Sequence, residues 1–145
     1  MIPEEIVLVE GGIRRQDSVH NALLEIMQDE QVPELVLVHD GARPFCSKKL
    51  IDRIIDAAHE HNAVIPVFPI EDTIRRISEE KTEVLDRHAL FATQTPQGFR
   101  TKLILEASKQ AIENKWLVND DASLVENNGD QVLTVKGEPQ NIKIT

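Results

Sequence analysis

The stretch Leu35-Val-Leu-Val38, followed directly by His39-Asp40-Gly41-Ala42-Arg43-Pro44, indicates the fold of this chain. Four consecutive aliphatic residues are typical of a buried strand, and the Gly and Pro that follow predict a turn at its carboxyl end. In open α/β sheets, ligands bind in the crevice beyond the carboxyl ends of the strands. The segment 35–44 therefore predicts an α/β fold with a functional loop after this strand.

The segments on either side continue an alternation of strand and helix. Apolar patterning predicts strands over 6–9, 35–38 and 63–67, and helices over 18–27 and 49–61. Asp17 or Ser18 is the expected N-cap of the first helix. Pro66 and Pro69 suggest that the third strand lies at a sheet edge or ends there. Strands separated by single helices predict a parallel sheet with crossover helices.

The pattern changes after Pro69. The remaining expected elements are strands over 73–77 and 82–85, helices over 100–113 and 120–127, and strands over 131–136 and 141–145. The first two strands flank the polar segment 78–81, which predicts a two-stranded arm at about 70–90, directed away from the main sheet. No linker or internal repeat divides the chain, so we expect a single domain over 1–145.

Composition excludes several classes of function. Sixteen Lys and Arg against 25 Asp and Glu give a net charge of −9, which disfavours non-specific binding to nucleic acid. A hydrophobic content of 41% is enough for a core. One cysteine cannot form an internal disulfide, which favours a reducing, cytoplasmic location. No apolar run approaches the roughly 18 residues of a membrane span, so no membrane partner is expected.

The loop after the 35–38 strand carries two residues suited to bind a charged ligand. Asp40 is a hard oxygen donor suited to Mg²⁺, and Arg43 offers a planar donor fork for an oxyanion. The alternative is a turn aspartate beside an arginine in a structural ion pair. His39 is expected to be a supporting residue.

The loop after 6–9 contains Gly11 and Gly12 but has neither of the common glycine-rich phosphate-binding spacings. Paired glycines with Ser18 at a helix start permit a ligand to approach the backbone closely. A tight turn with an N-cap is the alternative. Arg14 and Arg15 are expected to be solvated or ion-paired.

Three further polar features each have a functional and a structural interpretation. The loop 93–99, with Arg87 as charge partner, suits a phosphorylated or polyhydroxylated ligand, although a polar surface loop is the alternative. Asp120 and Asp121 are either metal ligands or acids at a helix N-terminus. Lys143, on an expected strand, is either functional or solvated.

Several blocks, taken in order, carry a family resemblance. They are VEGGIRRQDSV, LVLVHDGARPF, PVFPIEDTIRRI, LDRHALFATQTPQGF, VNDDASLVE and VKGEPQNIKIT. This set resembles the 2-C-methyl-D-erythritol 4-phosphate cytidylyltransferases over essentially the whole chain. The resemblance implies a Rossmann-like nucleotidyltransferase sheet with a protruding β-arm that forms a homodimer. It also implies transfer of CMP from CTP to the sugar-alcohol phosphate, with Mg²⁺ and release of pyrophosphate.

The resemblance assigns the nucleotide side of the site to four residues. Gly12 and Ser18 would lie at the cytosine and ribose of CTP. Asp40 would meet Mg²⁺ and the nucleotide, and Gly41 would pack close by where many members have Ala.

It assigns the other substrate to Thr73, Arg87, Thr95 and Lys143, which would hold methylerythritol phosphate. Arg87, from the arm, would reach across the dimer. Arg87 and Lys143 are the expected catalytic residues, since they would align the attacking phosphate. Asn119 stands where many members have Thr.

Family members begin with a strand and a loop reading roughly A-A-G-x-G-x-R-M, and they end with a helix after the N-I-K-[IV]-T strand. Neither segment occurs in these 145 residues, so we expect an incomplete sheet and an inactive isolated chain. Two alternative functions stay open. One is a ribitol-5-phosphate cytidylyltransferase, which shares the HD-x-x-RP and QTPQ blocks, although the EDT and DR-x-x-L segments favour methylerythritol. The other is an inactive dimerisation or ligand-binding module.

Overall fold

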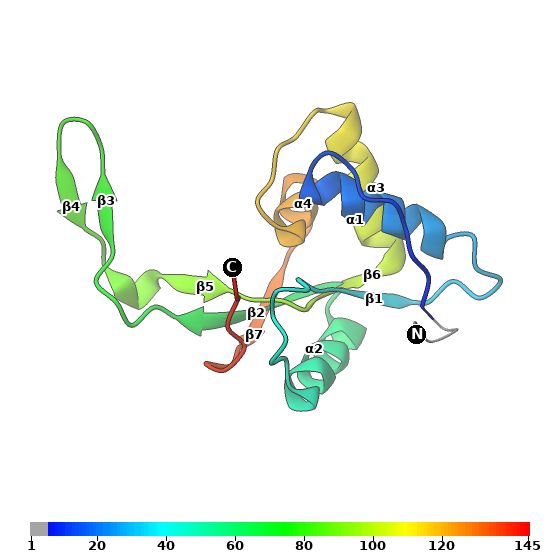
Figure 1. Ribbon diagram of the computed structural model, residues 1–145, viewed down its shortest axis with the longest axis horizontal. Helices are drawn as coiled ribbons and strands as arrows, with labels where there is room; N and C mark the ends of the chain where they lie inside the picture. Colours follow the sequence, from blue (N-terminus) through cyan, green and yellow to red (C-terminus); the bar gives the residue numbers. More distant parts are fainter. Residues whose placement is uncertain (1–5) are drawn as a thin grey trace.

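The computed structural model describes residues 6–145, which form a mixed sheet with helices on both faces and a projecting arm (Figure 1). In chain order the elements are α1 (Arg15–Ile26), β1 (Leu35–Val38), α2 (Lys48–Glu60), β2 (Ala63–Pro69), β3 (Arg75–Ile77), β4 (Thr82–Val84), the short 3₁₀ helix η1 (Arg87–Ala89), β5 (Phe91–Thr93), β6 (Gln97–Arg100), α3 (Thr101–Glu113), α4 (Asp121–Asn127) and β7 (Leu133–Lys136). The predicted α/β fold with a β-arm is confirmed.

Strand β2 lies at the centre of the sheet. It pairs with β7 in parallel on one side and with β6 and β5, both antiparallel, on the other. Ala63 stands opposite Phe99 and Val67 opposite Thr93, so β5 and β6 follow one another along the same side of β2. Strand β1 pairs antiparallel with β6. The predicted parallel sheet was therefore wrong: β1 and β2 run in the same direction, but the antiparallel strand β6 lies between them, so the sheet is mixed.

Of the two alternatives for Pro66 and Pro69, the sheet edge was wrong, because β2 is a central strand, whereas the strand end is confirmed, because β2 ends at Pro69. The two strands on the β5–β6 side are interrupted at 94–96, opposite Pro66. The N–H and C=O of one residue point to the same side of a strand, so the missing N–H of Pro66 faces this interruption. Its carbonyl still accepts a hydrogen bond of 2.8 Å from the Gln94 N–H.

Helices cover both faces of the sheet, with α1, α3 and α4 on one face and α2 on the other (Figure 1). Successive side chains of a strand point to opposite faces, so Val36 joins the α1–α3–α4 core while Leu35 and Leu37 pack toward α2. In α2, Leu50 and Ile54 are fully buried. Each such side chain contributes roughly 1.5–3 kcal/mol through burial.

Two predicted strands are absent. Residues 6–9 and 141–145 form no strand, because no other strand of residues 6–145 pairs with either. Leu8 is 76% exposed, so the apolar run 6–9 covers no core. The first helix begins at Arg15, and neither Asp17 nor Ser18 is its N-cap, although the Asp17 carboxylate accepts the Arg14 N–H at 3.1 Å. No helix in the described part of the chain is long and apolar enough to cross a membrane.

The predicted strands over 73–77 and 82–85 are observed, slightly shorter, as the hairpin β3–β4 (Figure 1). Arg76 and Glu83 face each other across the hairpin at 2.9 Å. Ile77 and Val84 are 75% and 56% exposed. The arm therefore carries apolar side chains that this chain alone leaves uncovered.

Candidate active site

Three predicted residues meet at the edge of the sheet where β1 and β7 end. Asp40 follows β1, Thr95 precedes β6, and Lys143 belongs to the segment after β7. The Asp40 N–H donates to Thr95 Oγ1 at 3.0 Å, and Lys143 Nζ donates to Asp40 Oδ2 at 3.0 Å. The structure thus joins residues up to 103 positions apart, and Lys143 is not a freely solvated side chain.

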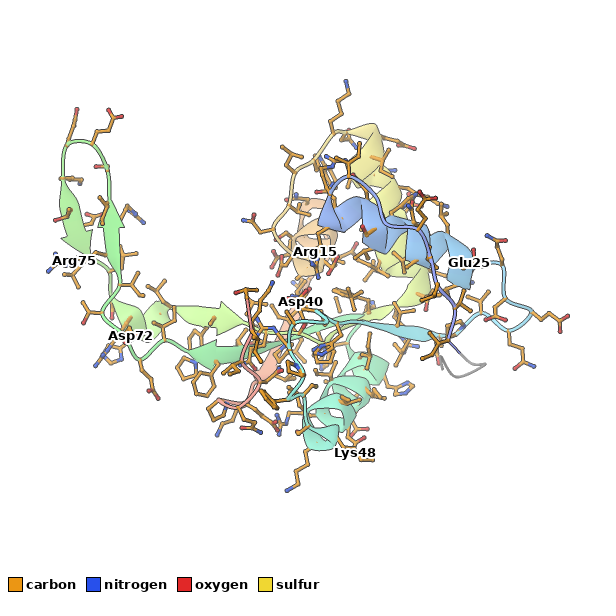
Figure 2. The ribbon with its side chains drawn as sticks, in the orientation of Figure 1. Arg15, Glu25, Asp40, Lys48, Asp72 and Arg75 are labelled. Atoms are coloured by element: carbon orange, nitrogen blue, oxygen red, sulfur yellow. The ribbon has the colours of Figure 1, made fainter. Side chains whose placement is uncertain are left out.

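Arg15 is part of this cluster, and of the two predicted alternatives, solvated or ion-paired, the ion pair is observed. As the first residue of α1, it directs its side chain toward Asp40 (Figure 2). Its Nε donates to Asp40 Oδ1 at 3.3 Å, and its Nη2 lies 2.8 Å from Asp121 Oδ2. Burial lowers the pKa of Arg15, but pairing with Asp121 and then Asp40 outweighs burial and raises it. Arg15 therefore stays charged.

Asp40 is surrounded by positive charge. Besides Arg15 and Lys143, Arg43 Nε lies 3.9 Å from its Oδ2. Partial burial raises the pKa of Asp40, but the Lys143 hydrogen bond and the charge of Arg15 together hold it below its usual range. The carboxylate is therefore ionised, and its Oδ1 and Oδ2 face different cations.

Asp120 and Asp121 are adjacent but have different environments. Asp120 is the N-cap of α4, and its carboxylate accepts the Ser123 N–H at 3.1 Å. Asp121 is fully buried, and burial raises its pKa although Arg15 opposes that shift. The helix-start interpretation thus explains Asp120, whereas Asp121 belongs to the Arg15 cluster.

His39 and Thr95 fix the loop around Asp40. His39 Nε2 lies 3.0 Å from the Arg43 carbonyl oxygen, which can only accept a hydrogen bond. In the neutral ring, Nδ1 is then an acceptor, and the Thr95 hydroxyl donates to it at 3.1 Å. Thr95 Oγ1 accepts the Asp40 N–H at the same time. His39 thus supports the loop, as the sequence predicted.

The loop 93–99 divides its polar groups between structure and site. Gln94 binds both the N–H and the carbonyl of Glu138, and Gln97 accepts the Ala122 N–H at 3.0 Å. Asn141, fully buried, donates to the Thr95 carbonyl at 2.8 Å. The Gln94 and Asn141 contacts anchor the segment that carries Lys143, and the Gln97 contact fixes the start of α4, so most of the loop is structural; the Thr95 hydroxyl holds the Asp40 loop.

The predicted glycine loop lies beside this cluster. The Gly12 N–H donates to Ser18 Oγ at 2.9 Å, and a Cβ on Gly12 would lie 2.3 Å from the Asp17 Cβ. Local packing therefore explains Gly12, as the tight-turn interpretation expects. Gly41 has no heavy atom within 4 Å of where its Cβ would stand, so the expected close packing there is not made by this chain.

Thr73 and Arg87 lie on the arm side of the molecule, and Figure 2 shows the neighbouring Asp72 and Arg75 well away from Asp40. Thr73 and Arg87 are both exposed, and Arg87 Nη1 donates to the Glu71 carbonyl at 2.5 Å. A single chain does not bring these two predicted residues to the Asp40 cluster.

The donor set around Asp40 limits how a metal can bind. Among residues 6–145 there is no group of three or more His, Cys, Asp or Glu side chains placed to hold a metal ion. Asp40 already faces three cations. The chain fits Mg²⁺ only in the mode in which phosphate oxygens supply most ligands and the protein supplies one carboxylate.

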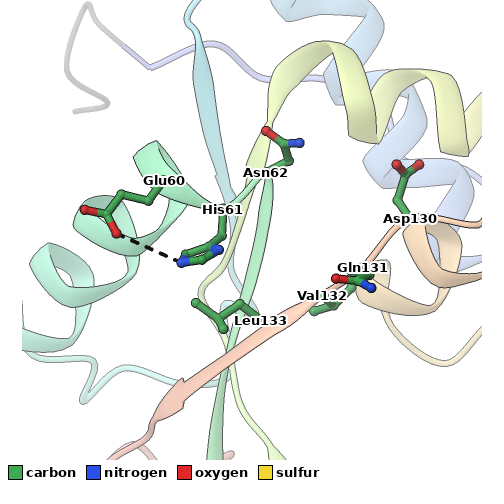
Figure 3. A pocket seen from close by; sticks show the side chains of 7 residues that line it. All are labelled: Glu60, His61, Asn62, Asp130, Gln131, Val132 and Leu133. Atoms are coloured by element: carbon green, nitrogen blue, oxygen red, sulfur yellow. Dashed lines mark ion pairs between the residues drawn. The ribbon is translucent and has the colours of Figure 1, made fainter.

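A pocket of about 260 Å³ lies at the opposite edge of the sheet, where β2 and β7 begin (Figure 3). It is lined by 60–62 and 130–133. His61 and Glu60 in its wall are 4.0 Å apart. None of the predicted site residues lines this pocket.

Known proteins resemble the chain throughout. The family model for 2-C-methyl-D-erythritol 4-phosphate cytidylyltransferase (IspD) matches residues 1–145. A protein of that name from Bacillus cereus is 44% identical over 145 residues, which cover 99% of this chain and 62% of that protein. The crystal structure of the Thermus thermophilus protein of that name superposes with a TM-score of 0.89 at 40% identity, covering 100% of this chain and 71% of that one. The Francisella tularensis structure gives 0.87 at 31% identity, covering 98% and 67%.

The chain thus spans about 62% of the length of the Bacillus cereus relative. Both the sequence match and the structural match extend over nearly all of its own residues. The chain belongs to the 2-C-methyl-D-erythritol 4-phosphate cytidylyltransferase family.

Proposed function

We propose that this chain forms the larger part of an enzyme that transfers CMP from CTP to 2-C-methyl-D-erythritol 4-phosphate in isoprenoid biosynthesis. One observation carries the proposal: Asp40, Thr95 and Lys143, all in blocks that match the family, converge at the carboxyl edge of the sheet. That edge is where open α/β sheets bind nucleotides.

The nucleotide belongs beside the Gly12–Ser18 loop and Asp40. Arg15 links that loop to Asp40, so the two segments form one continuous wall. Open space above Gly41 leaves room for a ligand to approach the backbone. Gly12, Ser18, Asp40 and Gly41 are the proposed contacts of CTP.

In the transfer, a phosphate oxygen of methylerythritol phosphate attacks the α-phosphorus of CTP in line. The bond from the α-phosphorus to the bridging oxygen breaks, and pyrophosphate leaves with that electron pair. Such a reaction requires the protein mainly to position the reactants and neutralise charge. Lys143 uses one of its three donors on Asp40, which leaves two for the attacking phosphate. Thr95 would lie beside that phosphate.

Mg²⁺ is part of the proposal, with Asp40 as its protein contact. When bound, the ion would neutralise charge on the triphosphate oxygens. Asp40 suits this role because it is ionised and 16% exposed.

We propose that Thr73 and Arg87 act from the partner subunit of a homodimer formed through the arm. The exposed Ile77 and Val84 of the arm would be covered in such a dimer. Arg87 is exposed and donates to the carbonyl of Glu71, next to Asp72, which Figure 2 shows well away from Asp40. The phosphate that Arg87 binds would therefore lie in the site of the partner chain. A cytoplasmic location fits the free thiol of Cys46.

The test is a pyrophosphate-release assay on the product of the complete reading frame and, in parallel, on the 145-residue chain. CTP with 2-C-methyl-D-erythritol 4-phosphate should be the preferred pair, and other nucleoside triphosphates should be poor donors. The 145-residue chain alone should show no transfer.

The alcohol phosphate distinguishes the nearest alternative. Preference for ribitol 5-phosphate over methylerythritol phosphate would replace the proposed substrate. Binding of either ligand without transfer by the complete product would support the inactive module instead.

A further inference from the structure

Asp121 is a buried carboxylate at the start of α4, but its neighbour Asp120 is the residue that caps this helix. Asp120 caps α4 and accepts hydrogen bonds from Ser123 and Gln97. Asp121 has an exposed fraction of 0%, and within the described residues neither its Oδ1 nor its Oδ2 has a partner in hydrogen-bond geometry. Burying a carboxylate with so few donors costs stability. Its close partner is Arg15, at 2.8 Å.

Arg15 connects this buried charge to the active site. Its guanidinium lies between Asp121 Oδ2 at 2.8 Å and Asp40 Oδ1 at 3.3 Å. A planar guanidinium can hold two carboxylates at once, whereas a lysine ammonium is a point charge without that geometry. Arg15 is 39% exposed on the side chain, so the buried Asp121 is the part of this pair that fixes its position.

We propose that Asp121 and Arg15 are a positioning pair that holds the carboxylate of Asp40 in its working orientation. Lys143 donates a hydrogen bond to the other carboxylate oxygen of Asp40, Oδ2. This inference rests on the proposed function, in which Lys143 also binds the attacking phosphate and so divides its donors between two partners. Arg15, anchored on Asp121, holds Oδ1 of Asp40 in place while Lys143 also binds the phosphate.

The test compares Asp121→Asn with the neighbouring Asp120→Asn in the complete gene product. Asn preserves the shape of Asp121 but removes the charge that anchors Arg15. Asp121→Asn should lower kcat roughly 10–100-fold, the range seen when a group that orients a functional side chain is removed. The KM for CTP should change much less. Asp120→Asn should keep the helix cap, because Asn caps about as well as Asp, and should lose only the acceptor for Gln97 Nε2, so kcat should stay within about twofold of wild type.

A second readout is independent of activity. In wild type, the Arg15 Nε–H faces Asp40 at 3.3 Å and should give a separate, slowly exchanging signal in a ¹⁵N NMR spectrum. Asp121→Asn should abolish that signal, and Asp120→Asn should preserve it. An unchanged Arg15 signal in Asp121→Asn would overturn the pair, even if the wild-type protein transferred no cytidylyl group and the proposed function itself failed.

Arg15→Lys covers the case in which Asp121→Asn does not fold. Lysine keeps the charge but cannot bridge both carboxylates, so kcat should fall in the same range. Wild-type kcat in Arg15→Lys, or wild-type kcat in an Asp121→Asn protein that has lost the Arg15 signal, would overturn the inference.

Discussion

At the scale of single residues, the site is organised around one carboxylate and three cations. Lys143 and Arg15 hold the pKa of Asp40 below its usual range, Arg43 lies 3.9 Å away, and the Asp40 N–H donates to Thr95. Electrostatic preorganisation of this kind is effective because the charges need not rearrange during the reaction.

Asp40→Asn should therefore be severely defective. Asn matches the shape of Asp40 but removes the charge that Lys143 and Arg15 share, so turnover should fall about 100-fold or more. The Mg²⁺ concentration giving half-maximal rate should rise, as measured by pyrophosphate release across a Mg²⁺ titration. Asp52→Asn, in an exposed pair with Lys48 on α2, is the matched control. Normal turnover with unchanged Mg²⁺ dependence would remove Asp40 from the site.

Arg87 should bind a phosphate through two parallel hydrogen bonds from its guanidinium. Arg87→Lys keeps the charge but loses bidentate geometry, so the KM for methylerythritol phosphate should rise or kcat should fall. The KM for CTP should stay nearly constant. Arg76→Lys, which alters a paired arginine on the same arm, provides the control. Equal effects on both substrates, or none, would count against a phosphate contact at Arg87.

The sequence predicts part of the candidate site at this scale, and there is a physical reason why it does not single out the rest. Asp40 stands directly after a strongly predicted strand, and Thr95 and Lys143 lie in specific sequence blocks. Arg15 and Asp121 carry no such signal, because arginines and acids at helix starts are common on protein surfaces. Only the folded structure shows that Arg15, at the start of α1, lies 2.8 Å from Asp121, at the start of α4.

At the scale of elements, local patterning predicted the helices better than the strands. The apolar stripe of α2 predicts its helix because it repeats every three or four residues. Strand β6 lies mostly within the segment 93–99 that the sequence predicts as a polar loop, because residues such as Gln97 are buried for hydrogen bonding rather than for apolar packing. For residues 6–9 the error was the reverse: the sequence predicts a strand and the structure has none. A strand needs a pairing partner, which the apolar pattern of one segment cannot reveal.

Gly98 in β6 tests the packing of this sheet on α2. A Cβ there would lie 2.6 Å from the Ile54 Cγ2 and 3.2 Å from a Leu37 methyl. Gly98→Ala should lower the free energy of unfolding by about 1–3 kcal/mol, as overpacking of a dense core does. Gly41→Ala, with no heavy atom within 4 Å of the new Cβ, should be close to neutral. Urea denaturation measures both, and equal stability of the two variants would mean that β6 does not approach α2 as described.

At the scale of the whole molecule, the predicted site residues fall into two groups. Asp40, Thr95 and Lys143 meet on the body, whereas Thr73 and Arg87 lie in the segments that join the arm strands β3 and β4 to β2 and β5, and Figure 1 shows that arm projecting away from the body. One chain cannot use both groups in the same site with this geometry. A symmetric dimer in which each arm reaches the partner's body would create two complete sites.

A site shared between subunits is tested by mixing two inactive variants of the complete gene product. Asp40→Asn and Arg87→Gln, carrying different tags, are combined under conditions of verified subunit exchange, and pyrophosphate release is measured. At equal amounts, half of the dimers are mixed, and in each of these one site has both Asp40 and Arg87 intact. Activity should recover to about a quarter of the wild-type value. Confirmed exchange with no recovered activity would show that the two residues do not act in one site across the dimer.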